Sequence, residues 1–128
     1  MGVEELKKLN VLYVEDEEEV SSEVIHNMRF FVNNIIFCKN GQEGLEIFKN
    51  QENSIDIIIT DVLMPVLDGQ KMVDEIRKIN ANVPVVFTTA FNNEKFIEYT
   101  LAQDLVENIS KPIDLEELFE SMLKLINK

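Results

Sequence analysis

The chain has 128 residues, 45% of them hydrophobic, which is enough for one domain with a sizeable core. Its 24 acidic and 12 basic residues give a net charge of −12, which excludes nucleic acid and anionic membranes as expected partners and favours cations or basic surfaces. No apolar run approaches the length of a membrane span, and the single cysteine, Cys38, excludes an internal disulfide. We therefore expect one cytoplasmic domain over residues 1–128.

The first part of the chain alternates a predicted strand with a predicted helix. The apolar run 10–14 predicts a strand, and five acids, Glu15 to Glu19, follow it. The last three of these acids are expected to be solvated at the start of a helix, where the helix dipole favours them. Apolar residues then recur at helical spacing at Val20, Val24, Met28 and Phe31. This helix is expected to end at Asn33–Asn34, before a second strand over 35–38, in which Cys38 is expected to be buried.

The middle of the chain contains its most apolar strand. A turn at Asn40–Gly41 precedes a second helix, and the run 55–61 then predicts a strand that ends on Asp61. Its residues from Ile57 to Thr60 are all β-branched, and the pattern is continuous rather than alternating. Such a strand is typical of a parallel sheet covered on both faces. The next helix carries Met72, Ile76 and Ile79 on one face.

The last part of the chain repeats this alternation twice. A strand is expected over 83–89 with Pro84 near its start, and another over 106–110. Between them, Asn92–Asn93 are expected to cap a helix that extends to about Gln103. Its apolar face is predicted at Phe96, Ile97, Thr100 and Leu101. A capping pattern of Asp114 and Glu117 predicts the last helix, and the whole alternation predicts a doubly wound α/β sandwich with a parallel sheet.

Five polar residues follow or end predicted strands, and they carry the functional hypothesis. They are Glu15, Asp16, Asp61, Thr89 and Lys111. The carboxyl ends of parallel strands line the usual ligand site of such folds, so these side chains are expected in one crevice. Carboxylates held close together repel each other unless a cation lies among them, and an oxygen-only set suits Mg²⁺. A carboxylate beside Mg²⁺, an ammonium and a hydroxyl predicts phosphorylation of an aspartate.

The same residues show that the sequence resembles the receiver domains of two-component response regulators, of the single-domain chemotaxis type. The motifs are Leu12-Tyr13-Val14-Glu15-Asp16, Thr60-Asp61-Val62-Leu63-Met64-Pro65 with Asp68-Gly69, Thr88-Thr89-Ala90 and Ser110-Lys111-Pro112. The resemblance implies a flavodoxin-like fold of strand order 2-1-3-4-5. It also implies that Asp61 is the phosphoacceptor, and that Thr89 and Lys111 contact the phosphoryl group.

The resemblance further implies the metal site and the partners. Mg²⁺ would be held by Glu15, Asp16, Asp61 and the Leu63 carbonyl. The phosphoryl group would come from a histidine kinase or a histidine phosphotransfer protein, and a downstream protein or output domain would respond. Such a domain catalyses its own phosphorylation and dephosphorylation without being a conventional enzyme.

Two departures and three alternatives accompany this interpretation. Asn108 stands where the family usually has Tyr or Phe, so weakened switching or a pure binding module is an alternative. Asp104–Leu105 replace a pair of small residues, so the loop before the last strand is expected to differ from the family. A flavodoxin is disfavoured because Glu15 to Glu19 would repel its anionic cofactor. A phosphatase of the haloacid dehalogenase type is disfavoured because it needs an Asp at position 63. His26 is expected to be a surface residue rather than a phosphodonor.

Overall fold

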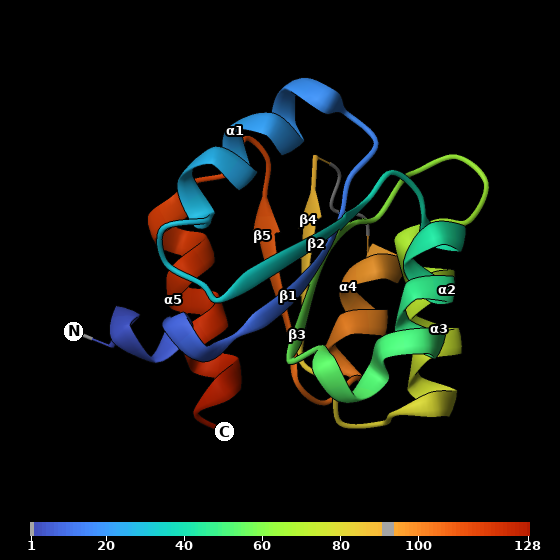
Figure 1. Cartoon of the computed structure of the whole chain (residues 1–128). Helices are drawn as coiled ribbons and strands as arrows, with labels where there is room; N and C mark the ends of the chain where they lie inside the picture. The colour runs from blue at the N-terminus through green and yellow to red at the C-terminus, as the bar shows by residue number, and fades with distance from the viewer. Residues whose placement is uncertain (1, 91–93) are drawn as a thin grey trace.

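The computed structural model describes residues 2–90 and 94–128, which form a three-layer sandwich with a central sheet (Figure 1). Across these residues the strands are β1 (Asn10–Val14), β2 (Asn34–Cys38), β3 (Ile57–Asp61), β4 (Val85–Thr89) and β5 (Val106–Ser110). The α-helices are α1 (Glu18–Met28), α2 (Gly41–Gln51), α3 (Gly69–Ile79), α4 (Glu94–Leu101) and α5 (Leu115–Ile126). Two 3₁₀ helices, η1 (Val3–Lys8) and η2 (Glu52–Ser54), complete the described elements. None of these helices is long and apolar enough to cross a membrane.

The strands are all parallel and follow the order β2-β1-β3-β4-β5. The predicted fold class and strand order are therefore confirmed. Strand β3 lies at the centre, and every one of its residues is buried. This burial explains why its apolar pattern is continuous, because side chains on both faces of the strand meet a layer of helices.

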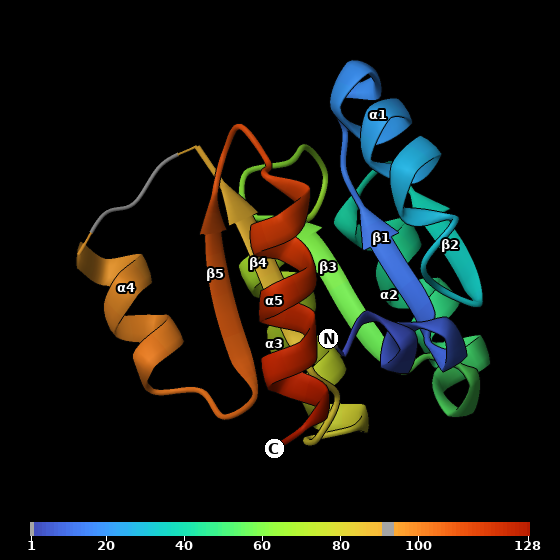
Figure 2. The same cartoon turned by 90° about the vertical axis from the view of Figure 1, so that its left-hand side faces the viewer.

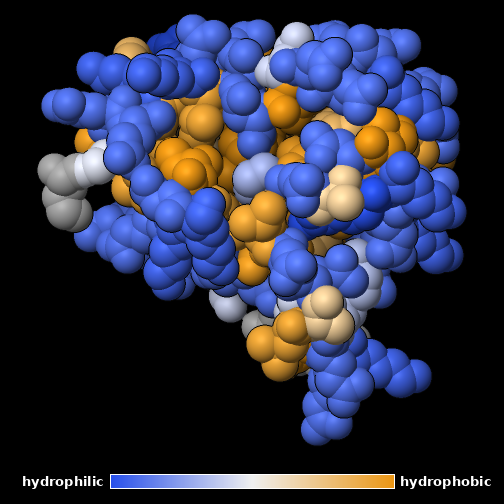
Figure 3. Space-filling view, turned by 90° about the horizontal axis from the view of Figure 1, so that it is seen from below, coloured by the Kyte–Doolittle hydropathy of each residue, from blue (hydrophilic) through white to orange (hydrophobic). Residues whose placement is uncertain are grey.

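The helices divide between the two faces of the sheet. Helices α1 and α5, with η1, cover one face, whereas α2, α3 and α4 cover the other (Figures 1 and 2). The core therefore has two parts, and alternate residues of β1 contribute to each. Val11 and Tyr13 pack toward α1 and α5, and Leu12 and Val14 pack toward α2 and α3. The end of the molecule where the strands begin is shown in Figure 3, where hydrophilic residues cover most of the view and hydrophobic residues are visible between them.

Several predicted boundaries differ by a few residues from those of the structure. Strand β3 begins at Ile57 rather than at Ile55, although the Asp56 N–H just before it still donates to the Asn10 carbonyl oxygen at 2.9 Å. Strand β4 begins at Val85, directly after Pro84, which has no N–H to donate. Helix α1 ends at Met28 rather than near Asn33, and Phe31 packs against the core from the following turn. Strand β2 begins one residue early, at Asn34.

The predicted apolar face of α4 is wrong in part. Phe96 and Thr100 are buried, but Ile97 is 41% exposed and Leu101 is 80% exposed. The inward position belongs instead to Tyr99, whose ring centroid lies 6.1 Å from that of Phe87 and whose hydroxyl donates to Asp74 Oδ1 at 2.8 Å. A tyrosine is amphipathic, so its ring packs inward while its hydroxyl finds a polar partner at the rim. The helix ends at Leu101, and the predicted cap at Asn92–Asn93 lies outside the described residues.

Cys38 is buried at the end of β2, as predicted, and burial raises the pKa of its thiol to about 11. At pH 9 a thiol with the ordinary pKa of 9.0 is half ionised, so Cys38 carries roughly fiftyfold less thiolate. We expect iodoacetamide to modify Cys38 very slowly in the folded protein and rapidly in urea, as followed by intact mass. Equal rates in the two conditions would show that the end of β2 is not packed in this way.

Candidate functional site

The acidic residues of the site occupy the carboxyl edge of the sheet because of where their strands end. Glu15 and Asp16 directly follow β1, and Asp61 is the last residue of β3, the strand that pairs with β1. Glu15 is fully buried, Asp61 is 6% exposed, and Asp16 is exposed. The backbone holds Asp61 in place, since the Val62 N–H donates to Asp61 Oδ1 at 2.8 Å. The sheet therefore brings Asp61 beside two acids from a distant part of the sequence.

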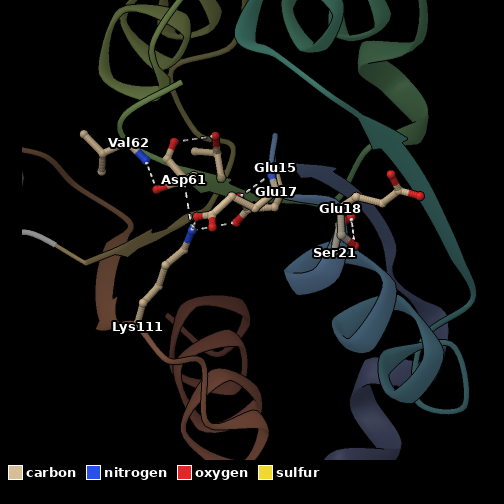
Figure 4. A network of polar contacts seen from close by, with 8 residues as sticks. Glu15, Glu17, Glu18, Ser21, Asp61, Val62 and Lys111 are labelled. Carbon is tan, nitrogen blue, oxygen red and sulfur yellow. Dashed lines mark hydrogen bonds and ion pairs between the residues drawn. The ribbon is translucent and has the colours of Figure 1, made fainter. Parts of the chain in front are cut away.

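Lys111 is the cation of this edge, at the first position after β5 (Figure 4). Its Nζ atom lies 2.9 Å from Asp61 Oδ2 and 2.9 Å from Glu15 Oε1. Its backbone N–H donates to the Thr89 carbonyl oxygen at 2.8 Å, which ties the loop after β5 to the end of β4. The lysine side chain is 10% exposed, so the ammonium and the carboxylates interact where water screens them little.

Burial and charge act in opposite directions on the pKa values of this group. Burial raises the pKa of Glu15, and the hydrogen bond from Lys111 only partly offsets this. Burial alone would lower the pKa of Lys111, but hydrogen bonds and charges from Asp61 and Glu15 outweigh it and raise the pKa. Lys111 is therefore a cation at neutral pH, and it balances part of the negative charge of the acids.

The acids can hold a metal ion. Each of Glu15, Asp16 and Asp61 offers one carboxylate oxygen, and these three oxygens lie within 4.8 Å of one another. The set contains no His or Cys ligand. The buried Glu15 Oε1 atom, apart from its ion pair with Lys111, accepts no hydrogen bond from the described residues, so it has lone pairs free for a cation. A hard, oxygen-only set with one exposed member suits a divalent cation that enters from solvent.

Thr89 and Leu63, the other predicted site residues, lie at the same edge. Thr89 is the last residue of β4, beside β3, and is 2% exposed. Leu63 lies two residues after Asp61, with 64% of its surface exposed. The roles of the Thr89 hydroxyl and the Leu63 carbonyl stay predictions.

Glu17 belongs to the site, although the acid run alone predicted a solvated residue at the start of a helix. Its Oε1 atom lies 3.3 Å from Lys111 Nζ. An acid run gives no periodic signal that separates one member from the next, so only the backbone turn before α1 reveals which of these side chains points to the lysine. Figure 4 shows that Glu17 does so and that Glu18 points away.

Asn108 is exposed on β5, and its side-chain amide donates to Thr100 Oγ1 of α4 at 2.9 Å. A polar contact between β5 and α4 thus occupies the position at which the family usually has an aromatic ring. We predict from this departure that phosphorylation moves α4 only weakly in this chain.

A parallel sheet of this order with a lysine-paired acidic edge defines the receiver class of α/β domains. The family model for the response regulator receiver domain matches residues 11–123. The chain therefore belongs to the response regulator receiver domain family, which acts in two-component signal transduction. This confirms the resemblance drawn from the motifs.

Individual relatives agree with the family assignment. The probable C4-dicarboxylate response regulator DctR of Bacillus subtilis (strain 168) is 33% identical over 121 residues, which cover 92% of this chain and 52% of the relative. The sensor kinase CckA of Brucella abortus (strain 2308) is 26% identical over 118 residues, which cover 92% of this chain and 12% of that protein. The chain thus spans about half or less of the length of these curated relatives.

Solved structures show the same fold. A response regulator receiver domain protein from Clostridium thermocellum superposes with a TM-score of 0.85 at 26% identity, covering 93% of this chain and 94% of that one. A structure of the CheX–CheY–BeF₃–Mg²⁺ complex from Borrelia burgdorferi matches with a TM-score of 0.82 at 25% identity, covering 94% and 90%.

Proposed function

We propose that Asp61 is the phosphoacceptor of this receiver domain. The contact of Lys111 Nζ with Asp61 Oδ2 at 2.9 Å, beside two further acids, is the observation that carries the proposal. A carboxylate is a weak nucleophile, and an approaching phosphoryl group is anionic, so the reaction needs positive charge at the point of attack. The chain supplies one such charge through Lys111.

The proposed step transfers a phosphoryl group from a donor to one oxygen of Asp61. A new bond forms between phosphorus and that oxygen, and the bond from phosphorus to the donor breaks. With phosphohistidine the leaving group is the imidazole, and with acetyl phosphate it is acetate. Lys111 would donate to a phosphoryl oxygen, and the Thr89 hydroxyl would donate to another. Mg²⁺, held by Glu15, Asp16, Asp61 and the Leu63 carbonyl, would supply the further positive charge that neutralises the phosphoryl oxygens.

The partners follow from this chemistry and from the relatives. A histidine kinase or a histidine phosphotransfer protein is proposed as the donor, because one relative is a sensor kinase whose length includes a segment like this chain. We propose that a downstream protein or an output domain responds to phosphorylation of this chain, as the response regulator relative suggests. We propose that residues 1–128 act as a single receiver domain in the cytoplasm, without contact to nucleic acid or membrane.

Acetyl phosphate tests the proposed function without a known kinase. With Mg²⁺ present, the intact mass of the protein should rise by one phosphoryl group, and a chelator should prevent the rise. The same gain of mass in the presence of the chelator would contradict the proposed role of the metal and of the acid cluster.

Metal binding should also stabilise the fold, because a cation relieves repulsion among Glu15, Asp16 and Asp61 and binds only where the fold gathers them. At a hundredfold excess of Mg²⁺ over its dissociation constant, the free energy of unfolding should rise by about 2.7 kcal/mol. Thermal melts of the wild type and of Asp16→Asn would measure this. The variant should gain less, and a melting temperature of the wild type that does not respond to saturating Mg²⁺ would contradict the metal site.

Asn108 favours a second candidate, a receiver that binds partners with little switching. Its hydrogen bond to Thr100 joins β5 to α4 through two short polar side chains. Neither side chain can fill the space that a rotating ring would occupy. This candidate predicts equal affinity for a partner before and after phosphorylation, whereas the phosphoacceptor switch predicts a difference.

A further inference from the structure

Glu17 contributes a carboxylate that contacts Lys111 but lies outside the metal-binding set. Its Oε1 atom accepts a hydrogen bond from Lys111 Nζ at 3.3 Å, whereas the oxygens grouped for a metal belong to Glu15, Asp16 and Asp61. Figure 4 shows the Glu17 and Lys111 side chains converging from α1 and from the loop after β5. Both residues also line a pocket of about 440 Å³ between these elements. Glu17 is thus placed to hold the lysine without holding the metal.

The local backbone explains why Glu17 reaches Lys111. Glu17 is the N-cap residue of α1, with an extended conformation of φ −88° and ψ 107°, and its side chain makes no capping hydrogen bond. Its backbone N–H donates to Glu15 Oε2 at 3.1 Å, which fixes its position beside the site. Helices are usually capped by shorter side chains such as Asp, Asn or Ser. The extra methylene of Glu directs the carboxylate to the lysine rather than back onto the helix.

Several anionic groups compete for the Lys111 ammonium, and Glu17 is one of them. The ammonium has three N–H donors, and in the structure Glu15, Asp61 and Glu17 surround it. A metal held by Glu15 and Asp61 would compete with Lys111 for their oxygens, and Glu17 would then be the acceptor that remains. A phosphoryl group on Asp61 would also accept a hydrogen bond from the Lys111 ammonium. The phosphoryl group would therefore compete with Glu17 for Lys111.

We propose that Glu17 is a positioning residue that restrains Lys111 in the unphosphorylated domain and so weakens the hold of the site on a phosphoryl group. The inference rests on the proposed function of Asp61. On phosphorylation the Lys111 side chain would have to move from the Glu17 carboxylate to the phosphoryl group on Asp61. Loss of the Glu17 contact should therefore strengthen the binding of a phosphoryl mimic.

Three variants separate the contact from the charge. Glu17→Gln removes the charge and weakens the hydrogen bond. Glu17→Asp keeps the charge, but its side chain is shorter and is suited to capping α1 instead. Glu18→Gln is the matched control, because it makes the same change in net charge next to Glu17 while the Glu18 side chain points away from Lys111 (Figure 4). Since Glu17 makes no capping hydrogen bond and its side chain is 62% exposed, all three variants should fold, which circular dichroism would verify.

The measurement is the affinity for beryllofluoride at saturating Mg²⁺, taken from the change of amide chemical shifts during titration. Both Glu17 variants should bind beryllofluoride about two- to fivefold more tightly than the wild type does. A change of this size corresponds to the free energy of one exposed ion pair. Glu18→Gln should bind like the wild type. Glu17→Gln should also bind Mg²⁺ more weakly, because a negative charge near the cation is lost, and a general loss of structure would not move the two affinities in opposite directions.

Two outcomes would overturn the inference while leaving the proposed function intact. The first is wild-type affinity for beryllofluoride in Glu17→Asp, which would show that the contact with Lys111 has no effect. The second is an equal gain in Glu17→Gln and Glu18→Gln, which would show an effect of net charge alone. A wild-type protein that does not bind beryllofluoride at all would instead contradict the phosphoacceptor function itself.

Discussion

Replacing Gly69 with alanine is expected to destabilise the fold by about 1–3 kcal/mol, as an overpacked core does. A Cβ atom at position 69 would lie 2.0 Å from the Asp61 carbonyl oxygen, which is backbone and cannot move aside alone. The Gly69 N–H also donates to the Val62 carbonyl oxygen at 2.8 Å, so the start of α3 is tied directly to the residue after Asp61. The added methyl group would therefore displace the segment that carries the proposed phosphoacceptor.

The comparison of Gly69→Ala with Gly2→Ala in urea unfolding would measure this effect. At position 2 the nearest atoms to a Cβ belong to Leu123 at 3.5 Å, an ordinary contact, so this variant should unfold like the wild type. Alanine is the better helix former by up to about 1 kcal/mol, and Gly69 is the first residue of α3. Stability equal to or greater than the wild type in Gly69→Ala would mean that α3 does not approach β3 as closely as the structure shows.

Replacing Asp61 with asparagine is expected to abolish phosphorylation by acetyl phosphate. The amide has the shape of the carboxylate but lacks the nucleophilic oxygen, and the Lys111 ammonium loses one of its anionic partners. We do not expect the neighbouring acids to replace Asp61, because Glu15 is fully buried against Lys111 and Asp16 is exposed. Intact mass after incubation with acetyl phosphate and Mg²⁺ should show no added phosphoryl group.

Asp56→Asn provides the control for this substitution. Asp56 precedes β3 at the opposite edge of the sheet, where its Oδ2 accepts a hydrogen bond from the Asn10 N–H at 2.8 Å. Asparagine can accept the same bond, so the variant should be phosphorylated as the wild type is. Phosphorylation that persists in Asp61→Asn, or that is lost in Asp56→Asn as well, would contradict the special role of Asp61.

The fold could be predicted from the sequence because its signals are local and regular. The β-branched run from Ile57 to Thr60 marked the central strand, and the alternation of strands with helices implied a parallel sheet. The positions of the five polar residues that follow or end strands could be predicted from the same pattern, since the ends of parallel strands share one edge. Lys111 could thus be placed beside Asp61 although 50 residues separate them.

Other features depended on tertiary contacts that no sequence period reveals. The inward role of Tyr99 required its hydroxyl to find Asp74, a residue of another helix. The contact of Glu17 with Lys111 depends on the backbone angles before α1, because a run of five acids has no repeating pattern to distinguish its members. The bond between Asn108 and Thr100 likewise joins a strand and a helix whose separation only the fold determines.

The most direct test is to locate the phosphoryl group on the wild-type chain. After reaction with acetyl phosphate and Mg²⁺, borohydride would reduce an acyl phosphate to an alcohol, and peptide mass spectrometry would identify the altered residue. The proposed function predicts homoserine in place of Asp61 and unaltered peptides elsewhere. A modified Glu15 or Asp16 with an intact Asp61, or a phosphoryl group carried by His26, would contradict it.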